Sequence, residues 1–294
     1  MMNEMIESFK IDFVGIGAAK AGTTWLGHML EGHPEVSMSV PKEVYFFNDM
    51  RFYGSKASMN FAKGISWYKK HFRHATNKIL KGEITPGYSI DAIAAERIKA
   101  HNPDIKILYC LRNPVDRIES HYNFVKSFLG EETRPMDQVI MEERELFEMS
   151  MYFKNISTYL EHFAEDQICI VWFEDIASQP AIVLDKVYSF LGVDHHYRPV
   201  SMHEKSNPGR RSRFPGLQQF ISGCKKVFIW AGLSGLIRKV KMAGLGDFMT
   251  KFNSRPIKKE SLTPELRQYI IEQVRDDVNK LAQWAKKDLK HWLT

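Results

Sequence analysis

Short apolar stretches alternate with longer segments of helical periodicity along the first two thirds of the chain. The apolar stretches predict buried β-strands at 11–16, 78–82, 105–111 and 167–173. Apolar residues that recur every three or four positions predict helices at 91–101, 115–128, 152–163 and 180–191. Alternation of this kind is typical of an α/β fold in three layers, with a mainly parallel central sheet flanked by helices.

The last third of the chain departs from this alternation. Residues 201–258 begin with the polar, basic and turn-rich stretch MHEKSNPGRRSRFPG, which leads into a basic amphipathic segment at 220–241. The pattern then predicts a C-terminal helix at about 264–290, with Thr263 as N-cap and Pro264 in the first turn. We therefore expect a single domain over 1–294, interrupted by a basic helical insertion at about 201–258.

The composition is ordinary for a globular protein of 294 residues, with 44% hydrophobic and 26% charged residues. The net charge of +6 favours a polyanionic ligand or serves general solubility; nucleic acid is not expected, because the basic residues are scattered outside any recognised binding module. The N-terminus lacks the apolar run of a signal peptide, and the longest apolar stretch, at 227–237, is too short to cross a bilayer. These features predict a cytoplasmic protein.

The first predicted strand runs into a glycine-bearing turn and then a helix. Gly17 and Gly22 have the spacing of a Walker A loop, but Thr23 and Thr24 follow the second glycine, and the lysine lies inside the loop at Lys20. Main-chain amides and the helix N-terminus can still hold an anion there. Lys20 is a candidate catalytic residue because its ammonium group can reach the oxygen of a leaving group.

A second anion-binding candidate follows the strand predicted at 105–111. ATP chemistry usually needs a carboxylate at such a position to hold Mg²⁺, but this strand is followed by Arg112. An arginine repels a metal ion and binds phosphate well, so we expect no metal and a nucleotide other than ATP. Two alternatives stay open: a Walker-type nucleotide kinase, and a non-enzymatic protein that binds a membrane surface or a partner through 220–241.

Two motifs carry a resemblance to a known family. The loop Lys20-Ala21-Gly22-Thr23-Thr24-Trp25 resembles the 5′-phosphosulfate loop of sulfotransferases that use 3′-phosphoadenosine 5′-phosphosulfate (PAPS). Residues 111–122, LRNPVDRIESHY, resemble the 3′-phosphate motif of the same superfamily, in which an arginine and a serine eight residues later bind the phosphate. The resemblance implies that Lys20, Ala21, Gly22, Thr23, Thr24, Trp25, Arg112 and Ser120 bind the nucleotide.

A third segment narrows the resemblance to the heparan-sulfate-type and bacterial branch. Residues 41–49, PKEVYFFND, are similar to its acidic-aromatic segment, which implies that Glu43 is the general base; the alternative is a carboxylate paired with Lys42. Residues 82–88 resemble a segment on the acceptor side, and Glu83 there is a rival base. Many glycan-modifying members have a lysine where this chain has Ile84, which weakens the inference to a heparan-like acceptor.

The resemblance also implies a reaction and its participants. A sulfuryl group would move from PAPS to a hydroxyl or amine of a small-molecule, lipid or glycan acceptor, and PAP would be released. The basic stretch with Lys205, Arg210 and Arg211 occupies the place of a nucleotide-closing loop, so these residues either contact the nucleotide or form a solvated charge run. Segment 220–241 is a candidate for peripheral membrane contact, whereas the oligomeric state cannot be inferred from the sequence.

Overall fold

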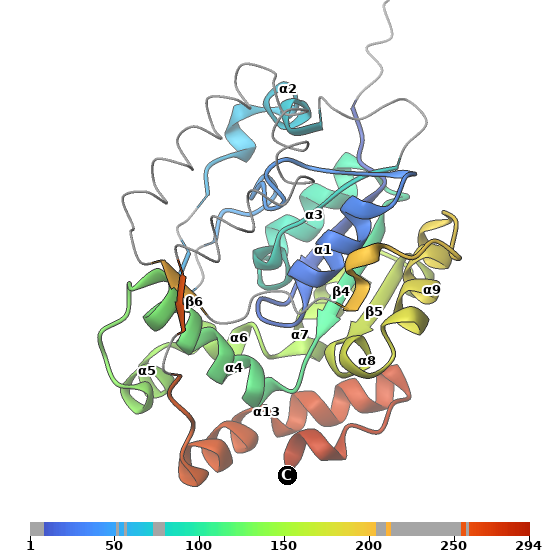
Figure 1. Ribbon diagram of the computed structural model, residues 1–294. Coiled ribbons are helices and arrows are strands. Elements are labelled where there is room, and N and C mark those ends of the chain that lie inside the picture. The colour runs from blue at the N-terminus through green and yellow to red at the C-terminus, as the bar shows by residue number, and fades with distance from the viewer. Residues whose placement is uncertain are drawn as a thin grey trace, which may run out of the picture.

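A five-stranded parallel sheet forms the centre of the fold (Figure 1). The computed structural model describes residues 9–50, 53–55, 58–72, 80–203, 210–212, 254–256 and 259–294. Its strands are β1 (Phe13–Gly17), β2 (Val36–Met38), β3 (Leu80–Ile84), β4 (Lys106–Leu111) and β5 (Ile168–Trp172), in the order β2-β3-β1-β4-β5. Every neighbouring pair in this sheet is parallel, and the strands are almost fully buried, as parallel strands with helices on both faces must be.

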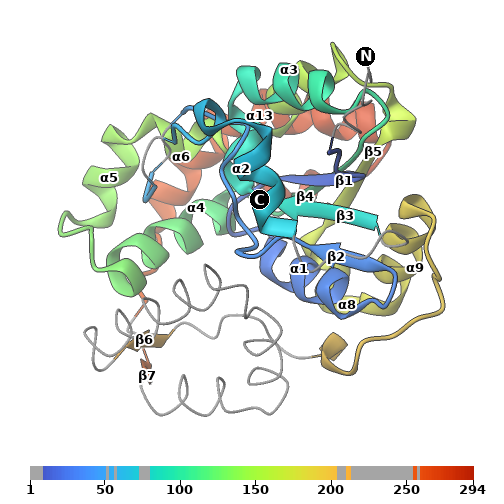
Figure 2. The ribbon, with the colours of Figure 1, turned by 90° about the horizontal axis from the view of Figure 1, so that it is seen from above.

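Helices cover both faces of the sheet (Figures 1 and 2). They are α1 (Thr23–Gly32), α2 (Ile65–Lys69), α3 (Ala92–His101), α4 (Pro114–Asn123), α5 (Met136–Glu142), α6 (Arg144–Glu148), α7 (Tyr152–Leu160), α8 (Phe173–Ser178), α9 (Pro180–Leu191) and α13 (Pro264–Ala285). Short 3-10 turns lie at Phe61–Lys63, Lys70–Phe72, Pro86–Ile90, Glu165–Gln167, Val200–His203 and Lys290–Leu293.

Side-chain hydrogen bonds join the helices within each layer. On one face, the Tyr188 hydroxyl of α9 donates to the carbonyl of Met29 in α1, at 3.0 Å. On the other face, Asp277 of α13 accepts from the first amides of α7, those of Phe153 and Lys154, each at 2.9 Å. The predicted three-layer α/β fold with a mainly parallel sheet is confirmed.

The helix that follows β4 begins where its sequence dictates. The side chain of Asn113 accepts from the amides of Val115 and Asp116, and Pro114 occupies the first helical position. The prediction of one helix over 115–128 is wrong at its end, because α4 stops at Asn123 and a π-helical turn, η4 (Phe124–Leu129), follows. A π-turn holds one more residue per turn than an α-helix, which periodicity alone does not reveal.

The insertion is described only at its two ends. Strands β6 (Arg210–Ser212) and β7 (Ser254–Pro256) pair antiparallel, so the chain leaves and re-enters the fold at nearly the same point (Figure 2). The helical content expected for 201–258, including segment 220–241, lies outside the described residues. The C-terminal helix is confirmed with its predicted Thr263 cap, although it ends at Ala285 rather than near 290.

Candidate active site

The order of the strands places two loops side by side. The connections that follow β1 and β4, which are neighbours in the sheet, leave towards opposite edges. In open α/β sheets ligands bind beyond the carboxyl ends of the strands at such a switch point, and we call this region the crevice. The loop after β1 holds Lys20, and the residue after β4 is Arg112. The amide of Ala18 donates to the carbonyl of Cys110 at 2.7 Å, which fixes the two loops relative to each other.

Tight backbone geometry shapes the loop between β1 and α1. Gly22 has a φ of 94°, in the left-handed region, and a Cβ at this position would lie 2.8 Å from Cδ1 of Ile176. Lys20 also has a positive φ, of 68°. Helix α1 begins at Thr23, and the amide of Leu26 donates to the carbonyl of Gly22 at 3.1 Å. The loop therefore directs a helix N-terminus, with its partial positive charge, into the crevice.

The other loop residues with a predicted role have distinct surroundings. The Thr23 side chain is buried, whereas that of Thr24 is partly exposed at the start of α1. The indole nitrogen of Trp25 donates to the carbonyl of Met202 at 2.9 Å. This bond holds the start of the 201–258 segment against α1, and the position of this segment beside the loop could not be inferred from the loop motif.

The ammonium group of Lys20 lies among other cations. Burial, together with the positive charges of Arg112 and Lys259, lowers the pKa of Lys20 to about 8, while the carboxylate of Glu43 acts in the opposite direction. The Nζ atom lies 4.2 Å from the centre of the Phe124 ring, at the start of the π-turn. Cations that are held close together and partly buried repel one another and favour the binding of an anion.

Arg112 extends from the end of β4 across the loop. Its Nη1 donates to the main-chain carbonyl of Lys20 at 3.3 Å, and its guanidinium lies 4.6 Å from the centre of the Phe173 ring. The hydroxyl of Tyr152 donates to the main-chain carbonyl of Arg112 at 2.8 Å, which fixes the backbone at the end of β4. Ser120, partly exposed, lies nearly two turns along α4.

Glu43 acts on the charge of Lys20 and has two partners of its own. Nζ of Lys42 lies 2.9 Å from its Oε1 atom, and the hydroxyl of Tyr45 donates to its Oε2 atom at 2.6 Å. The carboxylate is one-third exposed, and the pairing with Lys42 that the sequence suggested as an alternative is present. Phe46 and Phe47 point into the core instead of surrounding the carboxylate. The lysine and the tyrosine fix the direction in which the carboxylate points.

Glu83, the rival base, is completely enclosed. Its carboxylate accepts from the hydroxyls of Tyr68, Thr85 and Tyr88, at 2.7 to 2.8 Å, and from the amide of Val44 at 3.1 Å. Its side chain is 0% exposed, and burial raises its pKa despite these four donors. A carboxylate with every lone pair engaged does not reach an acceptor. Glu83 instead fixes the backbone next to Glu43.

Two further cations belong to the site. The Nζ atom of Lys42 is buried, and its distance to Glu43 is that of an ion pair without hydrogen-bond geometry. Lys259 acts on the charge of Lys20, and the neighbouring Glu260 exchanges hydrogen bonds with Asn123 of α4 at 2.8 Å. Among the residues assigned to a nucleotide-closing loop, Lys205 lies outside the described residues, and Arg210 and Arg211 are described only as backbone of β6.

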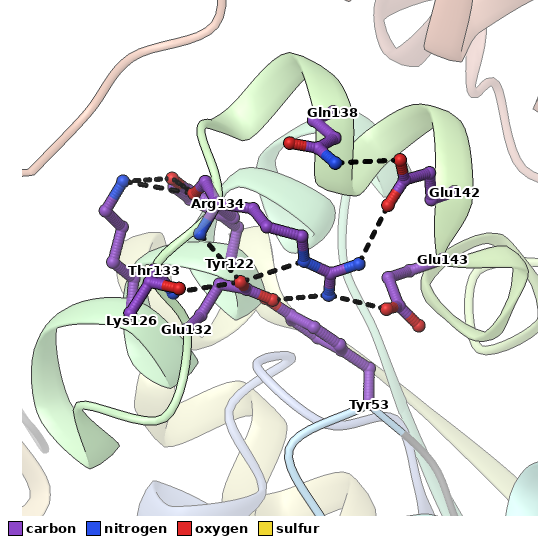
Figure 3. A network of polar contacts seen from close by, with 9 residues as sticks. All are labelled: Tyr53, Tyr122, Lys126, Glu132, Thr133, Arg134, Gln138, Glu142 and Glu143. Carbon is purple, nitrogen blue, oxygen red and sulfur yellow. Dashed lines mark hydrogen bonds and ion pairs between the residues drawn. The ribbon is translucent and has the colours of Figure 1, made fainter.

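A polar network braces the segment beyond the π-turn (Figure 3). Arg134 pairs with Glu132, Glu142 and Glu143, at 2.6 to 2.9 Å. The hydroxyl of Tyr53 donates to Glu132 at 3.1 Å, which connects the chain after Glu43 to the segment after α4. The arginine and the tyrosine hold the pKa of Glu132 at about 2, far below its ordinary value. The network thus connects the chain at Tyr53 to the segment that follows the π-turn.

The described residues lack the features of a metal site and of a membrane span. They contain no group of three or more His, Cys, Asp or Glu side chains arranged to hold a metal ion. Nor does any helix in the described part of the chain combine the length and apolar character needed to span a bilayer. Independence from metal and a cytoplasmic location stay predictions.

The fold and the cationic side chains define an α/β protein with a candidate anion-binding site at the switch point of its sheet. Residues 10–208 match the sulfotransferase domain family, and the chain belongs to this family. This is the family that the two phosphate motifs of the sequence resemble.

Individual relatives agree with this assignment. The chain is 24% identical over 293 residues to the membrane-associated sulfotransferase kil1 of Dictyostelium discoideum, with 67% of this chain and 60% of that protein covered. It is 30% identical over 205 residues to mouse heparan sulfate glucosamine 3-O-sulfotransferase 5, with 66% and 57% covered. The chain therefore spans only about 60% of the length of these relatives. A sulfotransferase structure from Alicyclobacillus acidocaldarius shares the fold, with a TM-score of 0.69, 22% identity, and coverage of 97% of this chain and 100% of that one.

Proposed function

We propose that this sulfotransferase moves a sulfuryl group from PAPS to a hydroxyl or amine of its acceptor and releases PAP. The observation that carries the proposal is the contact between its two anion-binding elements, in which Arg112 donates to the carbonyl of Lys20 across the crevice. PAPS has two anionic groups on one nucleoside, and this crevice offers a helix N-terminus with Lys20 for one of them and Arg112 with Ser120 for the other.

The residues of the crevice fit such a donor. Lys20 has a lowered pKa because it is buried next to Arg112 and Lys259, and a bound anion would relieve this repulsion. In this proposal Ala21, Gly22, Thr23, Thr24 and Trp25 form the 5′-phosphosulfate loop with Lys20. Lys259 adds positive charge on the same side, and Lys205, Arg210 and Arg211 remain candidates for closing over the nucleotide.

Each residue has a defined part in the reaction. PAPS supplies the sulfuryl group, and PAP is the leaving group, which departs through an oxygen of its 5′-phosphate. Glu43 accepts the proton of the acceptor as its oxygen or nitrogen forms the new bond to sulfur, and Lys42 and Tyr45 hold the carboxylate in place. Lys20 stabilises the negative charge that develops on the bridging oxygen as the sulfur–oxygen bond breaks. Protein cations and main-chain amides provide this stabilisation without a metal ion.

The relatives suggest two classes of acceptor. One is a heparan sulfate 3-O-sulfotransferase and thus acts on a glycan, whereas another is membrane-associated. Ile84, where many glycan-modifying members have a lysine, removes a cation from the acceptor side and favours a less anionic acceptor. No observation supports the Walker-type kinase or a non-enzymatic role.

Transfer of labelled sulfate tests the proposal. The protein is incubated with ³⁵S-labelled PAPS and, separately, with desulfated glycans, hydroxylated lipids and small phenols or amines. We expect label in one acceptor class and stoichiometric release of PAP, and neither with Lys20→Ala. The absence of transfer to every class, together with an absence of PAPS binding, would contradict the proposal.

A further inference from the structure

An exposed segment on the Glu43 side of the crevice combines apolar and basic side chains. Between Asp49 and Glu83, residues 50–82 contain eight lysines and arginines and no acidic residue, although the net charge of the whole chain is only +6. In the described part of this stretch, six exposed residues form what we call the basic apolar surface: Met59, Phe61, Lys63, Ile65, Lys69 and Lys70.

The apolar members of this surface are three large side chains. Met59 is 71% exposed, Ile65 is 40% exposed and Phe61 is 38% exposed, within seven residues of one another. Single exposed apolar side chains are common, but three large ones in one short segment mark an interaction site. The surface stands at the top of the molecule with α2, at the opposite end from α13 (Figure 1).

The base of this surface is firmly anchored. Tyr68, the residue of α2 that points inward, is fully buried, stacks on Phe46 with ring centres 4.3 Å apart, and donates to Glu83. Anchoring on this inner face leaves Ile65 and Lys69 on the outer face of the same helix. The exposed side chains are therefore presented by a fixed backbone.

Hydrogen bonds also connect this surface to the residues after Glu43. The side-chain amide of Asn60 donates to the carbonyl of Val44 at 2.9 Å, and the hydroxyl of Ser58 donates to the carbonyl of Tyr45 at 2.6 Å. A partner that covers Met59 would thus lie close to the mouth of the crevice.

The charge of the surface selects the chemistry of its partner. Among the described residues, no carboxylate pairs with Lys63, Lys69 or Lys70. Basic side chains beside exposed apolar ones match the interface of a bilayer that contains acidic lipids, where the head groups attract the cations and the acyl boundary takes up the apolar groups. A sulfated glycan would satisfy the cations and leave Met59 and Ile65 in water.

We propose that the basic apolar surface docks this sulfotransferase on a membrane that contains acidic phospholipids and brings the mouth of the crevice to the lipid head groups. The proposal concerns a different part of the chain from segment 220–241. It depends neither on PAPS as donor nor on Glu43 as base.

Flotation of the full chain with vesicles tests this docking. Vesicles of phosphatidylcholine alone are compared with vesicles that also contain about one-third phosphatidylserine. We expect at least about tenfold tighter binding to the acidic vesicles, weakened by salt. The pair Met59→Ser with Ile65→Ser, and the pair Lys69→Glu with Lys70→Glu, should each weaken binding at least about tenfold.

Matched controls come from exposed residues elsewhere. Ile182→Ser changes an isoleucine of α9 that is 60% exposed, and Lys280→Glu with Lys290→Glu repeats the charge change at the α13 end. We expect both controls to bind vesicles like the unaltered protein, and all variants to keep their melting temperature within about 2 °C. Absence of binding to acidic vesicles, or binding that survives both test pairs, would overturn the proposal. Binding to soluble heparin but not to vesicles would do so as well.

Discussion

The guanidinium of Arg112 donates a hydrogen bond to the main-chain carbonyl of Lys20, at 3.3 Å. The two residues are 92 positions apart in sequence, and they meet because β1 and β4 are adjacent parallel strands whose carboxyl ends share one edge of the sheet. One nucleotide with two anionic groups can therefore contact both elements at once. The account of this enzyme depends on that arrangement.

Loss of the Arg112 guanidinium should affect one phosphate more than the other. We expect Arg112→Ala to weaken the binding of PAP about 10- to 100-fold, the range for charged hydrogen bonds to a phosphate. The binding of AMP should weaken much less, because AMP lacks the 3′-phosphate. Isothermal titration calorimetry with both nucleotides measures the difference, and Ser120→Ala should reproduce it on a smaller scale. Equal losses for PAP and AMP would show that Arg112 does not bind the 3′-phosphate.

The affinity for PAP should fall with rising pH because of Lys20. Its pKa is about 8 in the free protein, below its ordinary value, and a bound anion would raise it, so binding takes up a proton above pH 8. Affinity should be nearly constant between pH 7 and 8 and then fall, by at most about tenfold per pH unit. Calorimetry from pH 7 to 9.5 measures this profile, with Lys20→Arg as the control that keeps its charge. A flat profile for the unaltered protein would refute the assignment.

The two glutamates should respond to substitution in different ways. Glu43→Gln should lower kcat by about 10²-fold or more and leave PAP affinity almost unchanged, because it removes only the proton acceptor. Glu83→Ala should lower the free energy of unfolding by about 2–4 kcal/mol, because four buried donors lose their acceptor.

Kinetics and urea unfolding separate these roles, with Glu96→Ala as an exposed control from α3 that we expect to be nearly neutral. Full activity of Glu43→Gln would exclude Glu43 as the base. Unchanged stability of Glu83→Ala would show that its enclosure is not structural.

The glycine that precedes α1 should tolerate no side chain. Gly22→Ala would place a methyl group 2.8 Å from Ile176 at a φ of 94°, so we expect a loss of about 2–4 kcal/mol of stability and weaker PAP binding. Gly192→Ala is the matched control: its φ is 82°, in the same left-handed region, but a Cβ there would meet only Nζ of Lys106 at 3.7 Å, and only the backbone cost of about 1–2 kcal/mol should remain. Equal losses in the two variants would contradict the steric part of the argument.

The network around Arg134 should make stability sensitive to acid. Glu132 has a pKa of about 2 in the folded protein, below its ordinary value of 4.5, so its contribution is complete above pH 4.5 and is lost as the pH falls towards 2. Glu132→Gln should therefore be less stable than the unaltered protein at pH 7, and this difference should shrink between pH 4.5 and 2. Urea unfolding at pH 7, 4 and 3 measures it; a constant difference would exclude the ion pair as its cause.

Local patterns were sufficient to place four of the five strands of the described sheet and the loops that follow β1 and β4. The residues of the loop from Lys20 to Trp25 are consecutive, so the sequence alone groups them. Arg112 is recognisable because it directly follows a strongly apolar predicted strand. Strand β2 was not predicted, because three residues are too few to establish a period. The π-turn after Asn123 also left no signal in the periodicity.

The rest of the site depends on contacts between distant segments. The enclosure of Glu83 requires Tyr68 and Val44 to meet it in space, and no spacing along the chain reveals this. Lys259 reaches the neighbourhood of Lys20 only because β6 and β7 bring the ends of the insertion together. The sequence suggests Lys42 as a partner for Glu43, but it does not reveal that the Lys42 side chain packs against Gly27 of α1.

A crystal structure with PAP tests the central claim most directly. The account predicts the 5′-phosphate within hydrogen-bond distance of Nζ of Lys20 and the first amides of α1, and the 3′-phosphate in contact with Arg112 and Ser120. A complex in which the Lys20 loop contacts no phosphate, or in which the Arg112 guanidinium lies away from every ligand oxygen, would contradict it.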